Sequence, residues 1–386
     1  MAEVALVGAP GTSSSLYKFN LIQPKPNGPA WPRPRSGHRT FVDNDFFYVI
    51  GGYTDNPEDS IFRELWKFNL VSQTWTACNI PENFPRTLAS FACQSSGNGS
   101  FIVYGGTGIP FGQELDETVY MGRVIGDDIR IEQVNPISQK RGCYGHVLVY
   151  DSKRNKTFSI GGTDGTQFKL DVHALQRNDA TGQWEWEEYA SYADDIGLYR
   201  MEAILENDSI YIFGGGTTQR IASFRTISVF NLERRVYEII DTEPDPVHGH
   251  PPGRRCHSLV QWGRQVIIAG GCYDDSRVVL SCVWSFNLDT HVWRKMDDLP
   301  NPVYFHDASI TAEGQMIIFG GVSNTNNPRG RVADLQTLWL GPPTLFSTAL
   351  AKMKKIANVT LNGNEFLLSD RLNLTRQIYS HSIQPA

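Results

Sequence analysis

The sequence of 386 residues lacks the features that mark several large classes of protein. Its six cysteines show no CxxC spacing, so we expect reduced, structural cysteines rather than a disulfide framework or a zinc site. No apolar run approaches the 18 residues or more of a membrane-spanning helix. The net charge of −6 leaves no basic excess for binding nucleic acid. The N-terminus has an acidic residue, Glu3, and no basic start, so we expect no secretory signal and a cytoplasmic and nuclear location.

Signatures of catalysis are also missing. The sequence contains no GxSxG, HExxH, phosphate-binding glycine loop or paired His/Cys metal spacing. We therefore predict a protein that is not an enzyme, with no catalytic residue, no metal and no cofactor.

What the sequence does contain is an apolar run that ends in two glycines and occurs six times. The doublets begin at residues 51, 105, 161, 214, 270 and 320, at intervals of 54, 56, 53, 56 and 50 residues. A second run with a shared signature follows three of the doublets: LWKFNL at 65–70, ISVFNL at 227–232 and VWSFNL at 283–288. A repeat at this period indicates a modular architecture.

Each repeat has the composition of four short β-strands. The apolar runs are rich in β-branched and aromatic residues, and Gly, Asn, Asp and Pro lie between them. Sheets of this kind cannot bury both faces alone, so they pack around an axis as the blades of a propeller. The double glycine followed by spaced aromatic residues resembles kelch repeats. We therefore predict an all-β, six-bladed kelch β-propeller with a short C-terminal helical tail.

The N-terminal segment is predicted to close the ring. LYKFNL at 16–21 nearly copies LWKFNL at 65–70, and only one clear strand, LQTLWL at 335–340, follows the last doublet. The sixth blade therefore lacks an outer strand, and residues 16–21 would supply it. Because these residues resemble a third strand rather than a fourth, their position within the sheet stays open. The predicted organisation is a flexible N-terminus at 1–15, a propeller at 16–341 and a helical tail at 342–386.

The segments that enter successive blades are predicted to surround one end of the axial channel. One position in these segments holds Ser36, Tyr144, Tyr199, Arg255 and Tyr304, and the next position holds Arg200 in one blade. Aromatic and arginine side chains are typical of binding hot spots, and two guanidinium groups facing one pocket suit a carboxylate. Alternatively, each arginine pairs with an acid of the next blade. Histidines at the same entrances, at positions 38, 146, 257 and 306, are best explained as residues that cap strand ends.

Five short motifs resemble the kelch domain-containing protein 10 family, from about residue 35 to 358. They are RSGHR (35–39), FRELW (62–66), YGGTGIPFG (104–112), RRCHS (254–258) and PVYFH (302–306). The resemblance implies a substrate receptor of a cullin-2 ubiquitin ligase, which holds the glycine-ended C-terminal peptide of a target protein in the propeller pocket. The predicted peptide-binding residues are Arg255, Arg200, Tyr144, Tyr199, Tyr304, Ser36 and His306.

The same resemblance implies binding to elongin B/C through a short helix. Thr344, Leu345, Ala349 and Met353 fit the spacing of that helix, and the last three share one stripe, as docking in an apolar groove requires. A helix that caps the propeller floor has the same spacing. The segment 357–372 lacks the early proline of the cullin-selective element, so the choice of cullin stays open.

Two further functions remain as alternatives to the ligase receptor. One is a kelch scaffold for signalling or cytoskeletal partners, with a capping tail. The other is a secreted-type oxidase without its signal, for which metal analysis would be the test. Co-purification with elongin B/C distinguishes the receptor from the scaffold.

Overall fold

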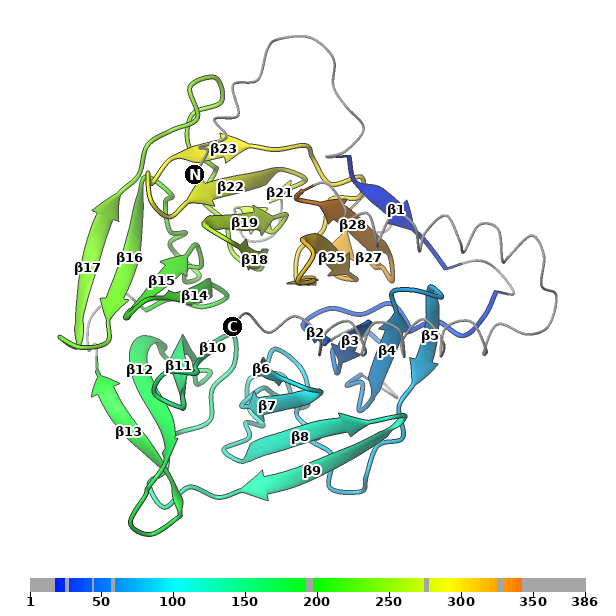
Figure 1. The fold of residues 1–386 in the computed structure, drawn as a ribbon, viewed down its shortest axis with the longest axis vertical. Coiled ribbons are helices and arrows are strands. Elements are labelled where there is room, and N and C mark those ends of the chain that lie inside the picture. The colour runs from blue at the N-terminus through cyan, green and yellow to red at the C-terminus, as the bar shows by residue number, and fades with distance from the viewer. Residues whose placement is uncertain are drawn as a thin grey trace, which may run out of the picture.

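The computed structural model describes residues 18–24, 28–43, 45–56, 60–191, 197–273, 278–324 and 330–341. In these ranges the regular structure is β-strand, and no helix is long and apolar enough to cross a membrane. Six four-stranded sheets surround a central axis (Figure 1). The prediction of an all-β, six-bladed propeller is confirmed. The predicted helical tail at 342–386 and the flexible N-terminus at 1–15 lie outside the described residues.

Each sheet is antiparallel, and its inner strand lies beside the axis (Figure 1). Sheet one contains β2 (Arg39–Asp43), β3 (Phe46–Ile50), β4 (Leu65–Asn69) and β5 (Thr74–Ala77). Sheet two contains β6 (Ala92–Gly97), β7 (Ser100–Tyr104), β8 (Val119–Ile125) and β9 (Asp128–Val134). Sheet three contains β10 (Val147–Asp151), β11 (Lys156–Thr163), β12 (Phe168–Arg177) and β13 (Trp184–Ala190). Sheet four contains β14 (Glu202–Glu206), β15 (Ser209–Phe213), β16 (Thr226–Asn231) and β17 (Val236–Asp241).

The last two sheets carry small additional hairpins. Sheet five contains β18 (Ser258–Trp262), β19 (Gln265–Ala269), β22 (Val283–Asn287) and β23 (Trp293–Lys295). Sheet six contains β24 (Asp307–Ile310), β25 (Gln315–Phe319), β28 (Leu335–Trp339) and β1 (Asn20–Ile22). The two-stranded hairpins are β20 (Cys272–Tyr273) with β21 (Val278–Val279), and β26 (Val322–Ser323) with β27 (Gly330–Arg331).

β1 joins the two ends of the propeller. It pairs antiparallel with β28, with Asn20 opposite Thr337 and Ile22 opposite Leu335. It takes the outer position of sheet six, because β28 already fills the third. Phe19, just before β1, is 8% exposed and packs in the apolar cluster between sheets five and six. A short strand and one buried aromatic side chain therefore attach the N-terminal segment to the last blade of the propeller.

The glycine doublets place neighbouring sheets in close backbone contact. Both glycines have positive φ in all six sheets, as in Gly105 (67°) and Gly106 (95°). The second glycine donates its N–H to a carbonyl of the next blade, here from Gly106 to Cys143 O at 2.9 Å. A β-carbon on Gly105 would lie 2.2 Å from that same oxygen. The doublet is therefore needed both for the backbone conformation and for the spacing between blades.

A closed ring of hydrogen bonds surrounds the axis. Each blade contributes one residue with φ between 56° and 64°, and its N–H donates to the corresponding carbonyl of the preceding blade at 2.8–3.1 Å. We call this set the backbone ring; its members are Gly37, Ser90, Gly145, Arg200, Cys256 and Phe305. The ring fixes the direction in which the residues before and after each member project.

The core lies between neighbouring blades. The Phe41 ring of sheet one stacks on Phe101 of sheet two, with centroids 5.3 Å apart. Trp75 lies 5.0 Å from Phe68 in its own sheet and 5.4 Å from Phe319 in sheet six. Burying one such side chain stabilises the fold by roughly 1.5–3 kcal/mol. The spaced aromatic residues of the repeat therefore join adjacent blades.

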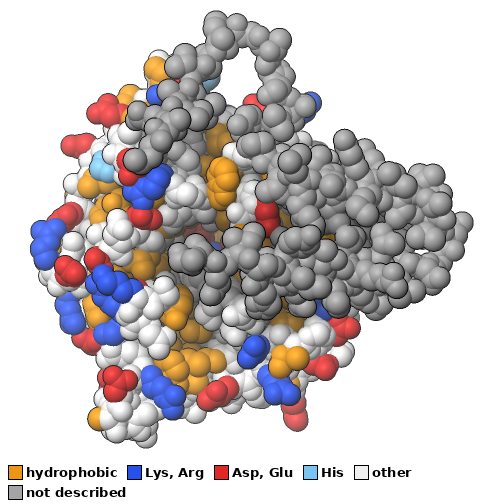
Figure 2. Space-filling model, viewed as in Figure 1, with side chains coloured by type: hydrophobic (Ala, Val, Ile, Leu, Met, Phe, Trp, Pro, Cys, Tyr) orange, Lys and Arg blue, Asp and Glu red, His pale blue; other side chains and the backbone are white. Residues whose placement is uncertain are grey.

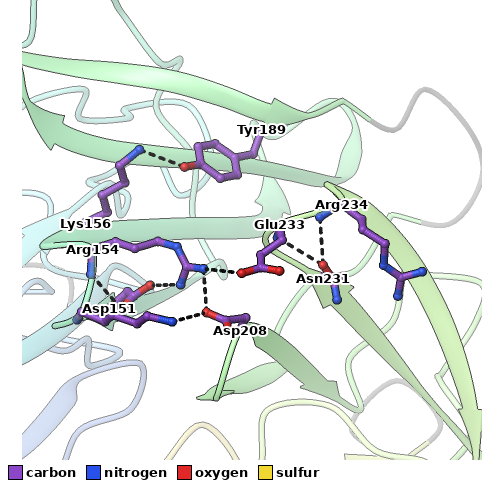
Figure 3. Close-up of polar contacts among 9 residues, drawn as sticks. Asp151, Arg154, Lys156, Tyr189, Asp208, Asn231, Glu233 and Arg234 are labelled. Carbon is purple, nitrogen blue, oxygen red and sulfur yellow. Dashed lines mark hydrogen bonds and ion pairs between the residues drawn. The ribbon is translucent and has the colours of Figure 1, made fainter.

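The hairpin face, where turns join the first to the second strand and the third to the fourth, is held by ion pairs (Figure 3). Arg154 of sheet three donates to Asp151 at 2.7 Å and to Asp208 of sheet four at 2.6 Å. Asn231 caps the next turn, because its Oδ1 accepts the backbone N–H of Arg234 at 2.9 Å. In the view of Figure 2, charges of both signs are mixed around the part of the molecule that is not covered in grey.

Candidate functional site

Six residues lie at equivalent positions directly before the backbone ring. We call them the entrance positions: Ser36, Ala89, Tyr144, Tyr199, Arg255 and Tyr304. Each pairs through its backbone with a residue just after the glycine doublet of its own blade. The ring and these bridges bring the six side chains to one end of the axial channel, which we call the rim face.

Aromatic side chains form a continuous arc on the rim face. Ring centroids lie 6.0 Å apart between Tyr53 and Phe111, 5.5 Å between Phe111 and Tyr144, and 5.7 Å between Tyr144 and Tyr199. Phe168 extends the arc, 5.8 Å from Tyr199. We call these five residues the aromatic arc. Each pair meets edge to face or tilted, and Phe111 is 45% exposed, so the arc offers apolar surface to a ligand.

Arg200 extends from the fourth blade across the channel. One Nη donates to Ser90 Oγ of the second blade, and the guanidinium carbon lies 4.5 Å from the ring centre of Phe305 in the sixth. The side chain also covers Tyr199 at 5.2 Å and is 9% exposed. Its Nε is buried without a hydrogen-bond partner, and it forms no ion pair with the described residues. Arg200 therefore provides a buried positive charge at the centre of the rim face.

Two other arginines lie nearer the edge of the rim face. Arg255 is half-buried, and its Nη1 donates to Thr217 O of the preceding blade at 2.5 Å. Arg331 donates from Nε to Ser36 Oγ at 2.9 Å, stacks on Tyr53 at 4.5 Å and pairs with Asp55. Arg200 and Arg255 precede the inner strands of the fourth and fifth blades, β14 and β18. That both reach one ligand is a prediction.

The remaining predicted site residues lie at different depths. Tyr144 and Tyr199 are half-buried, whereas Tyr304 is buried, with its ring tilted against that of Phe305 and the centroids 4.9 Å apart. Burial, with the neighbouring Tyr199 second, raises the pKa of Tyr144, so its hydroxyl is protonated at neutral pH and can donate a hydrogen bond. His306 lies below the rim, where its Nε2 is 2.9 Å from Ser258 Oγ.

Below the backbone ring, the channel is crossed by a buried ion cluster. Arg39 Nη1 lies 2.7 Å from Glu202 Oε1 and 3.3 Å from Asp307 Oδ1, which belong to the fourth and sixth blades. Its Nε donates to Phe91 O of the second blade at 3.2 Å. Burial raises the pKa of both carboxyl groups. Arg39 Nη2 donates to His146 O of the third blade at 3.5 Å. One arginine of the first blade therefore contacts four other blades at the floor beneath the rim face.

The four entrance histidines occupy equivalent buried slots. In each, the ring faces the first glycine of the preceding blade's doublet, as His146 faces Gly105. Burial lowers the pKa of all four, that of His306 to about 3, so they are neutral at physiological pH. Among the described residues, no three His, Cys, Asp or Glu side chains are grouped so as to hold a metal ion.

Several rim-face residues were missed by sequence reasoning. Tyr53, Phe111 and Arg331 come from segments between the second and third strands, and Phe168 begins the third strand β12. The prediction used only segments that enter a blade. The motif YGGTGIPFG, which contains Phe111, was an available signal. The predicted elongin-binding residues Leu345, Ala349 and Met353 lie outside the described residues.

Comparisons with known proteins match the sequence of this chain to a family. The model of the KLHDC2/KLHL20/DRC7 Kelch-repeats domain matches residues 127–321, and a kelch motif matches residues 34–81. Human kelch domain-containing protein 10 is 34% identical over 345 residues, 85% of this chain and 76% of the human protein. The rat protein is 34% identical over 366 residues, 90% of this chain and 87% of its own length. The Drosophila melanogaster homolog is 31% identical over 354 residues, 82% of this chain and 56% of its own length.

The chain belongs to the kelch domain-containing protein 10 family. The resemblance seen in the sequence motifs is thereby confirmed. The names of these kelch domain-containing protein 10 relatives describe no enzymatic activity, and kelch propellers are typically not catalytic.

Proposed function

We propose that this protein is the substrate-recognition subunit of a cullin-RING ubiquitin ligase. It binds glycine-ended C-terminal peptides on the rim face, and residues 344–353 bind elongin B/C, which connects it to cullin-2 or another cullin. The observation that carries the proposal is Arg200, a buried guanidinium with an unpartnered Nε and no ion pair among the described residues.

A terminal carboxylate is the ligand group that suits this arginine. A buried charge without a partner is unfavourable, and an arginine fork matches the two oxygens of a carboxylate. Glu202 is close enough for the two charges to influence each other but forms its ion pair with Arg39. A bound carboxylate would therefore supply the negatively charged hydrogen-bond partner for the Arg200 guanidinium. Arg255 would add a second positive charge from the entrance position of the neighbouring blade.

The surroundings of Arg200 support a small terminal residue. Tyr199 and Phe305 cover the guanidinium, and the backbone ring lies directly beneath it. A β-carbon next to the carboxylate would meet these rings, whereas glycine has none. Residues further from the peptide end would then extend over the aromatic arc.

Peptide binding tests this proposal. The probe is a synthetic ten-residue library with a fixed C-terminal glycine, prepared with a free or an amidated C-terminus. We expect Arg200→Gln and Arg255→Ala each to weaken binding of the free peptides by about tenfold or more, roughly 1.4 kcal/mol. Amidation of the peptide should weaken its binding to the wild type by a similar factor and should weaken its binding to either variant little further, because the arginines and the carboxylate act together.

Arg225→Glu is the matched control, because Arg225 is exposed and lies outside the arc and the entrance positions. Equal binding of amidated and free peptides by the wild type would refute the carboxylate role, whatever the arginine variants do.

Co-purification tests the ligase connection. Leu345→Asp should abolish capture of elongin B/C without changing the melting temperature, because it places a charge in an apolar groove. Leu345→Met is the control and should retain capture. If Leu345→Asp instead unfolds the propeller, residues 344–353 form a cap, and the scaffold function is favoured.

A further inference from the structure

A pocket lies away from the rim face, at the seam between sheets two and three. Its volume is about 440 Å³, and its apolar lining comes from Ile102 and Met121 of sheet two and from Leu175 and Trp184 of sheet three. Ser96 and Asn155, beside turns of the hairpin face, form part of its edge. The pocket is therefore separate from the proposed peptide site.

The repeat explains why this seam is hollow. In every blade, one residue near the start of the second strand lies opposite a residue of the third strand: Phe47 with Phe68, Phe101 with Gly122, Thr157 with Leu175, Ile210 with Phe230, Val266 with Phe286, and Met316 with Leu338. Thr157 is the one polar residue among the six on the second strand. It lines the pocket at a position where the other blades place an apolar side chain.

Two unpaired arginines border the pocket. Arg123 and Arg130 are direct cross-strand partners on β8 and β9, and both are exposed. Within the described part of the chain, neither side chain forms an ion pair or a hydrogen bond, and Glu132 lies near them without pairing. Like charges placed directly opposite each other on neighbouring strands are destabilising. The Asn residue that caps this turn in other blades, such as Asn231, is replaced here by Arg123.

We propose that this seam is a second docking site, for an extended segment of a partner protein in which acidic residues flank a large apolar side chain. The apolar side chain fills the space beside Thr157, and the flanking carboxylates neutralise Arg123 and Arg130. Charge complementarity selects this occupant, because a basic segment would add to the repulsion that the two arginines already experience.

Methyl NMR on the full chain can test the site, because the protein has six methionines and Met121 lines the pocket. With ¹³C-methyl methionine, Met121→Leu identifies the Met121 signal. The probes are two synthetic peptides, Ac-EDWDE-amide and Ac-KKWKK-amide. We expect the acidic peptide to shift the Met121 signal saturably through the ring current of its tryptophan, and the basic peptide to bind at least tenfold more weakly.

Variants of the arginines make the result specific. Arg123→Glu and Arg130→Glu should each weaken binding of the acidic peptide by tenfold or more. Arg123→Lys and the distant Arg225→Glu should leave its binding unchanged. No shift of Met121 at about 5 mM peptide, or equal shifts with both peptides, would overturn the proposal. A Met121 signal that moves with protein concentration would indicate a second copy as occupant. Stronger binding of a peptide of residues 365–370, EFLLSD, would indicate the chain's own tail. Either result would overturn a partner protein as the occupant.

Discussion

Replacing His146 with methionine should make the protein less sensitive to acid. His146 is fully buried, neither ring nitrogen has a hydrogen-bond partner, and burial followed by the nearby charge of Lys140 holds its pKa well below 6.5. The same slot holds Met201 in the fourth blade and Phe91 in the second, so the fold accepts an apolar side chain there. The substitution therefore removes a titrating group from a position that does not need one.

The sign and size follow from proton linkage. The pKa of His146 is lower in the folded state than in the unfolded state, so below pH 6.5 the unfolded chain binds more protons and stability falls. Each such histidine reduces the free energy of unfolding by about 1.4 kcal/mol per pH unit once the unfolded state is fully protonated. Between pH 7 and pH 5 the loss is about 2 kcal/mol per histidine, or about 8 kcal/mol for four. That sum is comparable with the whole stability of an ordinary domain.

Urea unfolding followed by tryptophan fluorescence at pH 7 and pH 5 measures this effect. The stability of His146→Met relative to wild type should rise by about 2 kcal/mol between the two pH values. The control is His248→Gln, which changes an exposed histidine and should show no such rise. A difference between His146→Met and wild type that is the same at both pH values would show that His146 is not held neutral by burial, and the reasoning would fail.

Three other predictions concern stability and can be checked by thermal unfolding. Arg39→Met should lower the free energy of unfolding by about 3–5 kcal/mol, because it leaves two buried carboxylates without their partner. Neutralising both carboxylates in the same variant should restore most of this stability, and no restoration would contradict the ion-cluster explanation. Deleting residues 1–23 removes β1 and should lower the melting temperature or solubility strongly, whereas deleting residues 1–12 should not; equal melting curves would mean that the ring closes in another way. Arg154→Ala should cost about 1 kcal/mol or less, and high salt should reduce the difference, because this ion pair is partly exposed.

Much of the fold could be predicted because the sequence repeat marks the number of blades and the position of a strand in each. Each glycine doublet marks the end of a second strand, and six doublets mean six blades. The likeness of residues 16–21 to LWKFNL, which is a third strand, could not predict the position of β1 in the sheet. That position depends on which strand of the sixth blade is missing. Because β28 is the third strand of the sixth sheet, β1 is the fourth.

The candidate site was harder to predict than the fold. The entrance positions follow from alignment of the repeats, but contacts across the channel depend on its width and on side-chain length. The contact of Arg200 with Ser90, two blades away, has no signal in local spacing. Phe111 and Arg331 come from segments of irregular length, so alignment cannot place them on the rim face.

The backbone ring has a consequence for how the rim face can change over time. Its six links join main-chain atoms, so no link depends on a particular side chain, and Gly, Ser, Arg, Cys and Phe all occupy ring positions. The left-handed conformation costs a residue other than glycine about 1–3 kcal/mol, and four positions carry this cost. Side chains at the mouth of the channel can therefore vary one at a time while the distances between blades stay constant. Such a protein can acquire a new ligand preference by single substitutions, without a new framework to hold them.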